Sequence, residues 1–416
     1  MVRLHINREF AIVIISFLVQ LPLAIFLGHY YDDRSFLDTG YLVSSGLNPY
    51  FPNVITVFAN PELVGTNPII GYPPLWPLLL GGIYRLTYGF TSNLFLYNFA
   101  IKVPVIASNI GLAYVTKAVM ERLNMPKRAV WFAWLFLLFN PFTLLTTTAW
   151  GEFDTLVALL CVASLYFLSK SMVVESSLLL SLSVVLKPVS FPLLGLPLLF
   201  STANNRRKNR LYLVILALFV FGLWILPFNL LGWMAPDSPN QVTAYFRMAG
   251  GMTLFNVLEI TQNTLTMPPN LGFLGYLWIP LLLLGYYYLY RHPPKTLEQL
   301  VESAVVLVLI SFLSRSWLSE PNLNLLFPFA LMLVGSGKIG RRFFHLLWVV
   351  PFVFLFLNYA FPQLFFLVYP SIIPAIGAFD LHLGVSRLLA RFAVTVVWYA
   401  LALWILYVLL VKRKPQ

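Results

Sequence analysis

Long apolar runs, separated by short polar, basic or proline-containing segments, cover most of the chain. The clearest runs are residues 10–27, 93–116, 211–231 and 388–411. Each is close to the ~20 residues that a helix needs to cross a bilayer. The runs are continuous and rich in leucine, unlike the alternating segments of about ten residues that build a membrane barrel. The pattern predicts an all-α polytopic membrane protein, a helical bundle of about 12 transmembrane helices with long external loops.

Two apolar segments are interrupted by proline. Residues 72–88 begin with a Tyr-Pro-Pro sequence and are short, which predicts a helix that dips into the membrane without crossing it. A true crossing is the alternative, and the charge pattern argues against it. Residues 176–200 lie between basic segments, so the charge pattern predicts a hairpin of short helices with both ends inside. Pro188 would break this hairpin and leave Lys187 at its tip, on the external side.

The composition agrees with a membrane protein and narrows the function. Charged residues make up 10% of the 416 residues, whereas soluble domains carry about 25%. The net charge of +12 comes mainly from Lys and Arg between the apolar runs, which is typical of cytoplasmic loops and indicates no nucleic-acid partner. The single cysteine, Cys161, excludes an intrachain disulfide and a multi-thiolate metal site.

Counting crossings from a basic, cytoplasmic N-terminus places two long loops outside, at residues 28–72 and 232–272. We expect one transmembrane module at residues 1–200, which contains the first loop, and a second module at residues 201–416. No internal repeat is evident in the sequence. Many transporters are built from two repeated halves, so this argues against a transporter.

Acidic residues are scarce, yet three of the 15 lie together in the first loop: Asp32, Asp33 and Asp38. Carboxylates are costly near hydrocarbon, so such a cluster at a membrane boundary indicates a functional site. The topology gathers further charged residues on the same side of the membrane. They are Glu152, Asp154, Lys187, Arg247, Arg315 and Glu320. A carboxylate can act as a general base toward a hydroxyl, and Lys and Arg can neutralise a phosphate leaving group.

The first loop carries a spaced motif, Asp32-(five residues)-Asp38-(seven residues)-Gly46-Leu-Asn-Pro-Tyr50. This motif resembles the first loop of the GT-C glycosyltransferases. The chain is most similar to those that use polyprenyl- or dolichyl-phosphate mannose, namely the catalytic subunit of the first GPI mannosyltransferase and bacterial lipid-mannoside mannosyltransferases. Further segments resemble later motifs of that family, in the family's order: Tyr72-Pro-Pro-Leu75, Trp150-Gly-Glu-Phe-Asp154, Leu186-Lys-Pro188 and Ser319-Glu-Pro-Asn322. The chain departs from the family at Glu152, Asn109 and Pro321, which bears on the sugar more than on the reaction.

The resemblance implies a GT-C-type helical bundle and an inverting transfer of a sugar, with mannose expected, from a polyprenyl-phosphate donor to a glycolipid or glycan acceptor. It implies Asp32 as the base, with Asp38 as the second candidate. It also implies substrate contacts. The residues expected to make them are Asp33, Arg34, Tyr72, Glu152, Asp154, Lys187, Arg247, Arg315 and Glu320, with Lys187, Arg247 and Arg315 on the donor phosphate.

A monophosphate donor requires no bridging metal, so we expect neither a metal nor a cofactor. The active site is expected on the non-cytoplasmic face of a prokaryotic plasma membrane or, in a eukaryote, of the endoplasmic reticulum membrane.

Other interpretations of the same residues stay open at this point. Asp33 and Arg34 can form a surface ion pair, and Asp32, Asp38, Glu152 and Asp154 can cap helices. Lys187, Arg387 and Arg391 can snorkel to the membrane surface. For the whole chain, the alternatives are a flippase or transporter of lipid-linked sugars, a non-catalytic scaffold subunit, or another GT-C activity such as a glycan ligase.

Overall fold

The computed structural model describes residues 8–50, 70–200, 206–220, 222, 225–233, 248–262 and 265–411. The predicted all-α class is confirmed, because the only strands in these residues are the two-residue β1 (Gly250–Gly251) and β2 (Trp317–Leu318). Six described helical segments are long and apolar enough to cross a membrane, as expected of a polytopic membrane protein. They are Arg8–Phe26, Leu94–Arg122, Lys127–Ala149, Pro269–Arg291, Leu297–Ser314 and His382–Leu410.

Eight elements lie between Arg8 and Ala149. They are α1 (Arg8–Phe26), α2 (Tyr30–Ser44), α3 (Leu75–Leu86), α4 (Tyr88–Thr91), α5 (Leu94–Arg122), α6 (Lys127–Phe139), α7 (Pro141–Leu144) and the π-helical turn η2 (Leu145–Ala149). The elements that follow are α8 (Asp154–Ser169), α9 (Val173–Leu186), η3 (Pro188–Leu193), α10 (Leu196–Phe200), α11 (Arg206–Val220) and α12 (Leu226–Leu230), of which α9, η3 and α10 cover the predicted hairpin.

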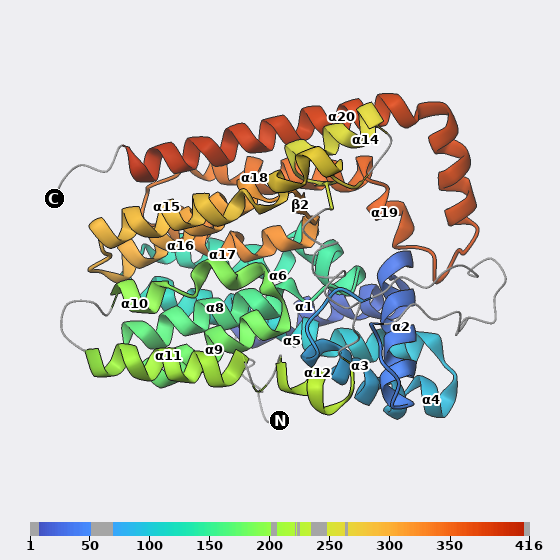
Figure 1. The fold of residues 1–416 in the computed structure, drawn as a ribbon, viewed down its shortest axis with the longest axis horizontal. Helices are drawn as coiled ribbons and strands as arrows, with labels where there is room; N and C mark the ends of the chain where they lie inside the picture. The colour runs from blue at the N-terminus through green and yellow to red at the C-terminus, as the bar shows by residue number, and fades with distance from the viewer. Residues whose placement is uncertain are drawn as a thin grey trace, which may run out of the picture.

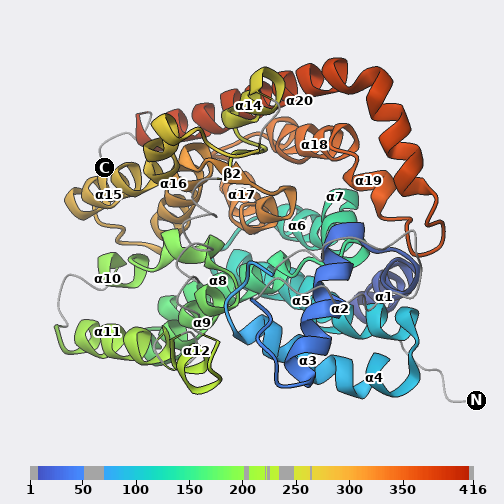
Figure 2. The same ribbon diagram turned by 45° about the vertical axis from the view of Figure 1, so that its right-hand side comes forward.

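The remaining elements belong to the second half of the chain. They are η5 (Leu254–Asn256), α14 (Val257–Gln262), η6 (Pro269–Tyr276), α15 (Trp278–Arg291), α16 (Leu297–Ser314), η7 (Glu320–Leu325), α17 (Phe327–Gly335), α18 (Arg341–Leu357), α19 (Ala360–Gln363) and α20 (Ile372–Leu410). Figure 1 shows α8, α9, α15 and the longer, C-terminal part of α20 running in one general direction, with α2 crossing that direction near one end of the bundle. Figure 2 shows the same crossing from a second direction.

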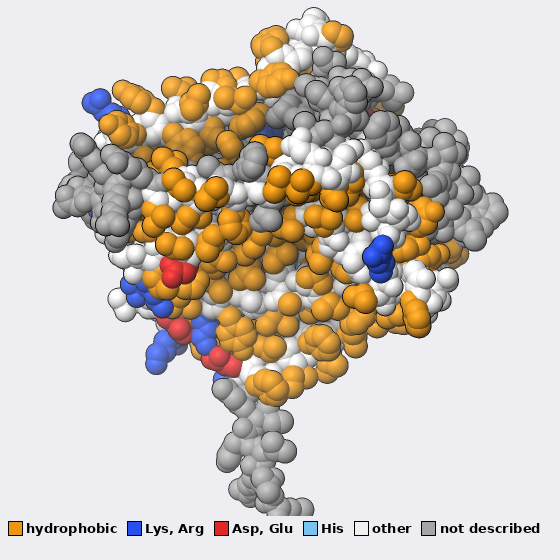
Figure 3. All heavy atoms as spheres, turned by 60° about the horizontal axis from the view of Figure 1, so that its bottom comes forward, with side chains coloured by type: hydrophobic (Ala, Val, Ile, Leu, Met, Phe, Trp, Pro, Cys, Tyr) orange, Lys and Arg blue, Asp and Glu red, His pale blue; other side chains and the backbone are white. Residues whose placement is uncertain are grey.

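The outside of the molecule is largely apolar, as a bilayer requires. Figure 3 shows one face covered mostly by hydrophobic side chains, with the charged side chains gathered mainly toward one edge. Large side chains on the long helices are exposed, including Phe17 and Leu18 of α1 and Leu283 and Leu284 of α15. Exposed apolar area of this extent is unusual for a soluble monomer and is explained by contact with lipid.

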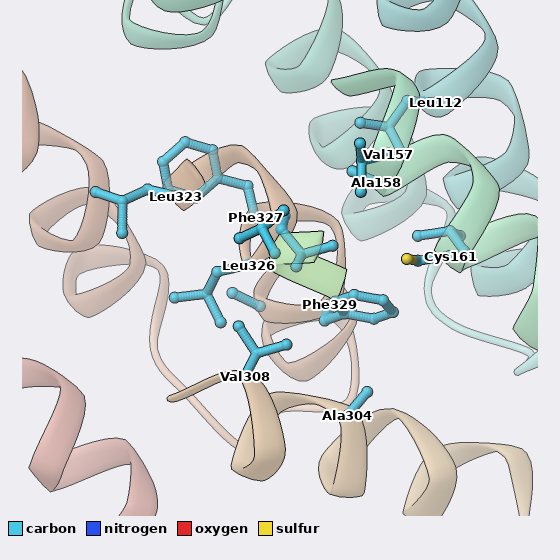
Figure 4. Close-up of a cluster of buried hydrophobic side chains, with 14 of the residues drawn as sticks. Leu112, Val157, Ala158, Cys161, Ala304, Val308, Leu323, Leu326, Phe327 and Phe329 are labelled. Atoms are coloured by element: carbon cyan, nitrogen blue, oxygen red, sulfur yellow. The ribbon is translucent and has the colours of Figure 1, made fainter. Parts of the chain in front are cut away.

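The interior is packed by apolar side chains from both halves of the chain. Figure 4 shows Phe327 and Phe329 of α17 in the space between α8, which contributes Cys161, and α16, which contributes Ala304 and Val308. All five side chains are buried. Because α8 belongs to the first half and α16 and α17 to the second, this core holds the two halves together.

The part of the expected external loop that directly follows α1 forms a helix. The α2 helix runs from Tyr30 to Ser44 and packs against α3. Asp32 and Asp33 lie in its first turn, where their negative charges complement the helix dipole. Residues 51–69 of the predicted loop lie outside the described residues. The α3 helix has 12 residues, or about 18 Å at 1.5 Å per residue, so it is too short to cross a bilayer, as the sequence predicted.

The hairpin predicted at residues 176–200 is confirmed in its main feature. The α9 helix ends at Leu186, and Pro188 begins the short 3₁₀ helix η3. Lys187, between the two, has an extended backbone with φ −153° and ψ 118°. The break therefore places the Lys187 side chain at the tip of the hairpin, beyond the end of α9.

A buried polar cluster joins α1, α5 and η2 within the apolar bundle. The Asn109 amide donates to Gln20 Oε1 at 2.8 Å and to the Thr148 hydroxyl at 2.9 Å. Gln20 donates in turn to the Ser16 hydroxyl at 3.0 Å. Unpaired polar groups are costly at membrane depth, so these mutual hydrogen bonds fix the relative position of the three elements.

The β1–β2 pair ties the second long loop to the segment before η7. Gly250 pairs with Trp317 and Gly251 with Leu318, in parallel register. Gly251 has φ +59°, and an added Cβ would lie 2.2 Å from the Leu318 carbonyl oxygen. Only glycine fits this close approach without strain. The pairing positions Leu318, two residues before Glu320.

We therefore expect Gly251→Ala to destabilise the protein by about 1–3 kcal/mol, because the left-handed backbone and the carbonyl contact both become strained. The measurement is the thermal unfolding temperature of the detergent-solubilised protein. Gly272→Ala is the matched control, since an added Cβ there meets nothing within 4 Å. Equal unfolding temperatures for the two variants would contradict the strain assigned to Gly251.

Candidate active site

Asp32 lies against two aromatic side chains at the start of α2. The Trp150 indole Nε1 donates a hydrogen bond of 2.5 Å to Asp32 Oδ2. His29 Nδ1 lies 3.0 Å from the same oxygen. The His29 and Trp150 rings are stacked, with centroids 3.9 Å apart and planes at 15°. The three side chains therefore form one unit, which joins α2 to the segment that follows η2.

Lys187 lies between two carboxylates. Its Nζ is 2.8 Å from Glu152 Oε2 and 2.7 Å from Asp154 Oδ2. The other carboxylate oxygens are also bonded, Glu152 Oε1 by the Tyr72 hydroxyl at 2.6 Å and Asp154 Oδ1 by the Asn322 amide at 2.8 Å. The network thus connects four segments: the tip of the hairpin, the start of α8, the residues that precede α3, and η7.

These contacts decide between the earlier interpretations of two residues. Asp154 makes no capping hydrogen bond to the backbone of α8, whose N-cap residue is Phe153. Lys187 is buried and ion-paired, so it does not snorkel to the membrane surface. Both residues belong to the buried network instead.

A second buried amine, Lys102 of α5, lies behind this network. Its Nζ donates to the backbone oxygens of Leu27 and of Ala149, the latter at 2.9 Å. Leu27 precedes His29 by two residues, and Ala149 ends η2 directly before Trp150. Lys102 therefore fixes both chain segments that carry the Asp32 unit.

Asp33 is packed against the same two chain segments, near Gly28 and Gly151. An added Cβ at Gly28 would lie 1.6 Å from Asp33 Oδ2, and one at Gly151 would lie 3.7 Å from Asp33 Oδ1 and 3.1 Å from the Lys102 side chain. Within the described part of the chain, neither carboxylate oxygen of Asp33 has a hydrogen-bond partner. The opposite charge of Lys102 is close enough to act on the carboxylate. Asp33 is 3% exposed, which rules out a surface ion pair with Arg34.

Glu320 adds a carboxylate from the second half of the chain. It is buried at the start of η7 and accepts a hydrogen bond of 2.7 Å from the Asn358 amide. Charge interactions connect it with His29 and with Arg391 of α20. Arg391 is paired with Glu259 of α14 at 3.0 Å, and Arg387 with Asp380 at 2.9 Å, so neither arginine simply snorkels.

The other predicted residues are placed less centrally. Arg34 donates to the Tyr30 hydroxyl at 2.9 Å, and Asp38 is buried one turn further along α2. Residues four apart share a helix face, so Asp38 lies on the face of Arg34 and not on that of Asp32. Arg315 directly follows α16 and is half-buried. Arg247 lies outside the described residues.

The pKa values in the site depart from the ordinary ones for physical reasons. Burial raises the pKa of Glu152 to about 7, against the charge of Lys187 and with help from Asp32 and Asp154. Burial likewise raises the pKa of Asp33 to about 7, with Lys102 opposing. Burial also raises the pKa of Asp32, but the hydrogen bond and charge of His29, the Trp150 bond and Lys187 outweigh it and leave a lowered value. Burial opposes the charge of Lys187, yet Asp154 and Glu152 raise its pKa.

The arrangement brings together residues from distant parts of the sequence. Asp32 interacts electrostatically with Lys187 and with Glu152, and His29 with Glu320. Carboxylates with different pKa values side by side can divide the work of holding and accepting protons. In the described part of the chain, no group of three His, Cys, Asp or Glu side chains could hold a metal ion.

Sequence reasoning did not select several residues of this site. His29 and Trp150 belong to segments that were examined, but their ring stacking depends on two segments about 120 residues apart. Lys102 carried a detectable signal, a lysine inside a long apolar run, which marks a functional or structural position by default. Asn322 belongs to the segment Ser319–Asn322 that resembles a family motif, but its partner did not follow from the sequence, and Asn358 carried no signal.

Comparison with known proteins adds a similarity to solved structures. No protein-family model matches the chain, and no curated protein matches it either. The crystal structure of ArnT from Cupriavidus metallidurans bound to undecaprenyl phosphate is similar to this chain with a TM-score of 0.47 and 16% sequence identity, over 97% of this chain and 77% of that one.

We expect Lys187→Met to destabilise the protein by about 3–5 kcal/mol, because Glu152 and Asp154 would stay buried without a cation. The measurement is the thermal unfolding temperature in detergent. Adding Glu152→Gln and Asp154→Asn to the same protein should restore much of the loss. Lys170→Met, at an exposed lysine, is the control. A normal unfolding temperature for Lys187→Met would show that the ion pairs contribute little.

Protein stability should also depend on pH. Glu152 and Asp33 have pKa values of about 7 in the folded protein, above the value of about 4 of an unfolded carboxyl. The folded state then holds extra protons between these values, so the stability that these two carboxyls contribute is fully present below about pH 4 and is lost as the pH rises through 7. The unfolding temperature should decrease from pH 5 to pH 8, and less so in Glu152→Gln/Asp33→Asn. An unchanged slope in the double variant, with exposed Glu121→Gln as control, would refute the assignment.

Proposed function

We propose that the protein is a membrane glycosyltransferase that moves a sugar, mannose being the expected one, from a polyprenyl-phosphate donor to a glycolipid or glycan acceptor. The observation that carries the proposal is the convergence of Asp32, Glu152 and Lys187 at the end of the helical bundle where α2 crosses it. A donor with an apolar tail and a charged head would place its phosphate at such a boundary. The first-loop motif and the ordered later motifs support a GT-C activity.

The proposed reaction is a direct displacement at the anomeric carbon. The acceptor hydroxyl loses its proton at the Asp32 unit, and its oxygen attacks C1 of the sugar. The bond from C1 to the phosphate oxygen breaks, and polyprenyl phosphate leaves with the electron pair, so the configuration at C1 inverts. Asp32 keeps its negative charge at neutral pH because His29 and Trp150 lower its pKa. Its side chain is 15% exposed, which leaves it within reach of a substrate.

The donor phosphate needs a positively charged side chain nearby. Lys187 is a candidate, but its charge is balanced by Glu152 and Asp154. With Glu152 and Asp154 both ionised, the Lys187 group has a net charge of −1, and a proton on Glu152 makes it neutral. The pKa of Glu152, at about 7, lets this change occur near neutral pH. We propose that Lys187 contributes to the phosphate site when Glu152 is protonated, and that Arg315 and Arg247 supply further charge. Glu320, Tyr72 and Arg34 complete the proposed substrate contacts.

The proposal predicts transfer activity that depends on Asp32. Purified protein is mixed with radiolabelled polyprenyl-phosphate mannose and membrane lipid extracts, and labelled products are separated. Asp32→Asn should lower kcat about 10²–10⁴-fold, as is typical for loss of acid–base catalysis. Glu121→Gln, an exposed carboxylate on α5, should retain the activity of the parent.

Two results would change the conclusion. If the folded parent transfers no sugar from any polyprenyl-phosphate donor, the proposed function is wrong, and a flippase assay with the same labelled lipids becomes the next test. If it transfers glucose or galactose and not mannose, the reaction class stands and the sugar is reassigned.

A further inference from the structure

We propose that Tyr50 is a positioning residue, whose hydroxyl holds the backbone of Tyr72 so that the Tyr72 hydroxyl stays bonded to Glu152, beside Asp32. This role rests on the proposed transferase function and adds to it a task for residues 46–50, the last part of the first-loop motif. These five residues, named the motif turn below, follow directly on α2.

The motif turn begins with the end of α2. Gly46 has φ +75°, a left-handed conformation that favours glycine. The Gly46 amide donates to Val43 O at 3.1 Å, and the Leu47 amide donates to Leu42 O at 2.8 Å. This pair of bonds is the Schellman arrangement that commonly ends a helix. The chain therefore leaves the direction of α2 directly before Asn48.

Asn48 then fixes the backbone of Tyr50. Its side-chain oxygen accepts from the Tyr50 amide at 3.0 Å, which is an Asx turn, and its side-chain amide donates to Trp233 O at 3.0 Å. The Tyr50 ring packs against Phe228 and Trp233, with ring centroids 5.0 and 6.0 Å apart. Tyr50 is 7% exposed. The motif turn is thus attached to a segment of the second half of the chain, at the end of α12.

The Tyr50 hydroxyl connects this junction to Tyr72. It donates to the Tyr72 backbone oxygen at 2.7 Å. Tyr72 lies outside α3, which begins at Leu75, so helical hydrogen bonds do not fix its backbone. The Tyr72 hydroxyl in turn donates to Glu152 Oε1 at 2.6 Å, and its ring lies against Phe153 with centroids 5.1 Å apart. The bond from Tyr50 therefore holds the Tyr72 side chain where it meets Glu152.

The Tyr72 bond matters because the protonation of Glu152 changes the net charge around Lys187. The groups that face Glu152 are Lys187 from the tip of the hairpin, Asp154 of α8, Asp32 of α2 and the Tyr72 hydroxyl. A hydroxyl that donates to a carboxylate favours its ionised form. The Tyr72 bond therefore opposes the protonation of Glu152, which burial favours.

The first test needs no activity, since it follows the unfolding temperature of the detergent-solubilised protein against pH. Loss of a hydrogen bond to the ionised form raises the pKa of Glu152, so the stability that this carboxyl contributes should be lost at a higher pH. We expect Tyr72→Phe to move this change upward by about one pH unit. Tyr50→Phe, which keeps the ring packing on Phe228 and Trp233, should move it by less in the same direction. Tyr290→Phe, at an exposed tyrosine, is the control.

The double variant Tyr50→Phe/Tyr72→Phe shows whether Tyr50 acts through Tyr72. We expect its shift to equal that of Tyr72→Phe alone, and both single shifts to disappear in a Glu152→Gln background. Two shifts that add in the double variant would show that Tyr50 acts independently of the Tyr72 hydroxyl. Additive shifts, a Tyr50→Phe variant without a shift, or shifts that persist in Glu152→Gln would each overturn the proposal.

The second test follows sugar transfer. If Lys187 contributes to the phosphate site when Glu152 is protonated, KM for the polyprenyl-phosphate mannose donor should rise as the pH increases through about 7. Tyr50→Phe should move this rise to a higher pH and change the pH dependence of KM more than that of kcat, because the Trp150 bond to Asp32 remains. Tyr290→Phe should behave as the parent does.

The two failures are distinguishable. An active parent whose Tyr50→Phe variant keeps the parental pH dependence of KM would overturn the positioning role while the transferase function stands. A folded parent without transfer activity would remove the proposed function, and the unfolding measurements would still decide whether Tyr50 acts on Glu152 through Tyr72.

Discussion

The buried pairing of Lys187 with Glu152 and Asp154 is the interaction on which the rest of the site depends. Charges removed from water are tolerated only when they are paired and hydrogen-bonded, so removing one partner leaves the others uncompensated. Here every carboxylate oxygen has a partner, and the partners come from the tip of the hairpin, the start of α8, the approach to α3 and η7. The ion pairs thus determine how four distant segments meet, and they place Glu152 where its charge acts on Asp32.

Lys102 performs a related structural task with backbone acceptors. By donating to the backbone oxygens of Leu27 and Ala149, it fixes the two chain segments that carry the His29 imidazole and the Trp150 indole beside Asp32. A lysine inside an apolar helix would be unfavourable without such bonds. The two buried amines therefore have different consequences. Lys187 sets the charge of the site, and Lys102 sets its geometry. The Asp32 unit is connected to both amines, to Lys102 through the backbone oxygens of Leu27 and Ala149 and to Lys187 by its charge.

Much of the site could be predicted from the sequence, for reasons that can be stated. Asp32, Glu152, Lys187 and Glu320 were expected on one side because apolar runs and basic loops determine the direction of each crossing. The structure brings these residues together. The helix at residues 30–44 was not predicted, because a polar segment with few apolar positions resembles a loop when its packing partner α3 is unknown. Asp38 was ranked beside Asp32 from motif spacing, whereas helical geometry turns it to another face.

The sequence by itself determined the membrane-embedded helical class, the hairpin break at Pro188 and the gathering of charges at one end, since hydrophobic length, proline geometry and charge act locally along the chain. Only the tertiary structure decided which charges are paired, which nitrogen faces Asp32 and which carboxyls hold a proton near neutral pH. Those properties depend on burial and on distances between segments far apart in sequence, such as His29 and Trp150. No local pattern contains that information.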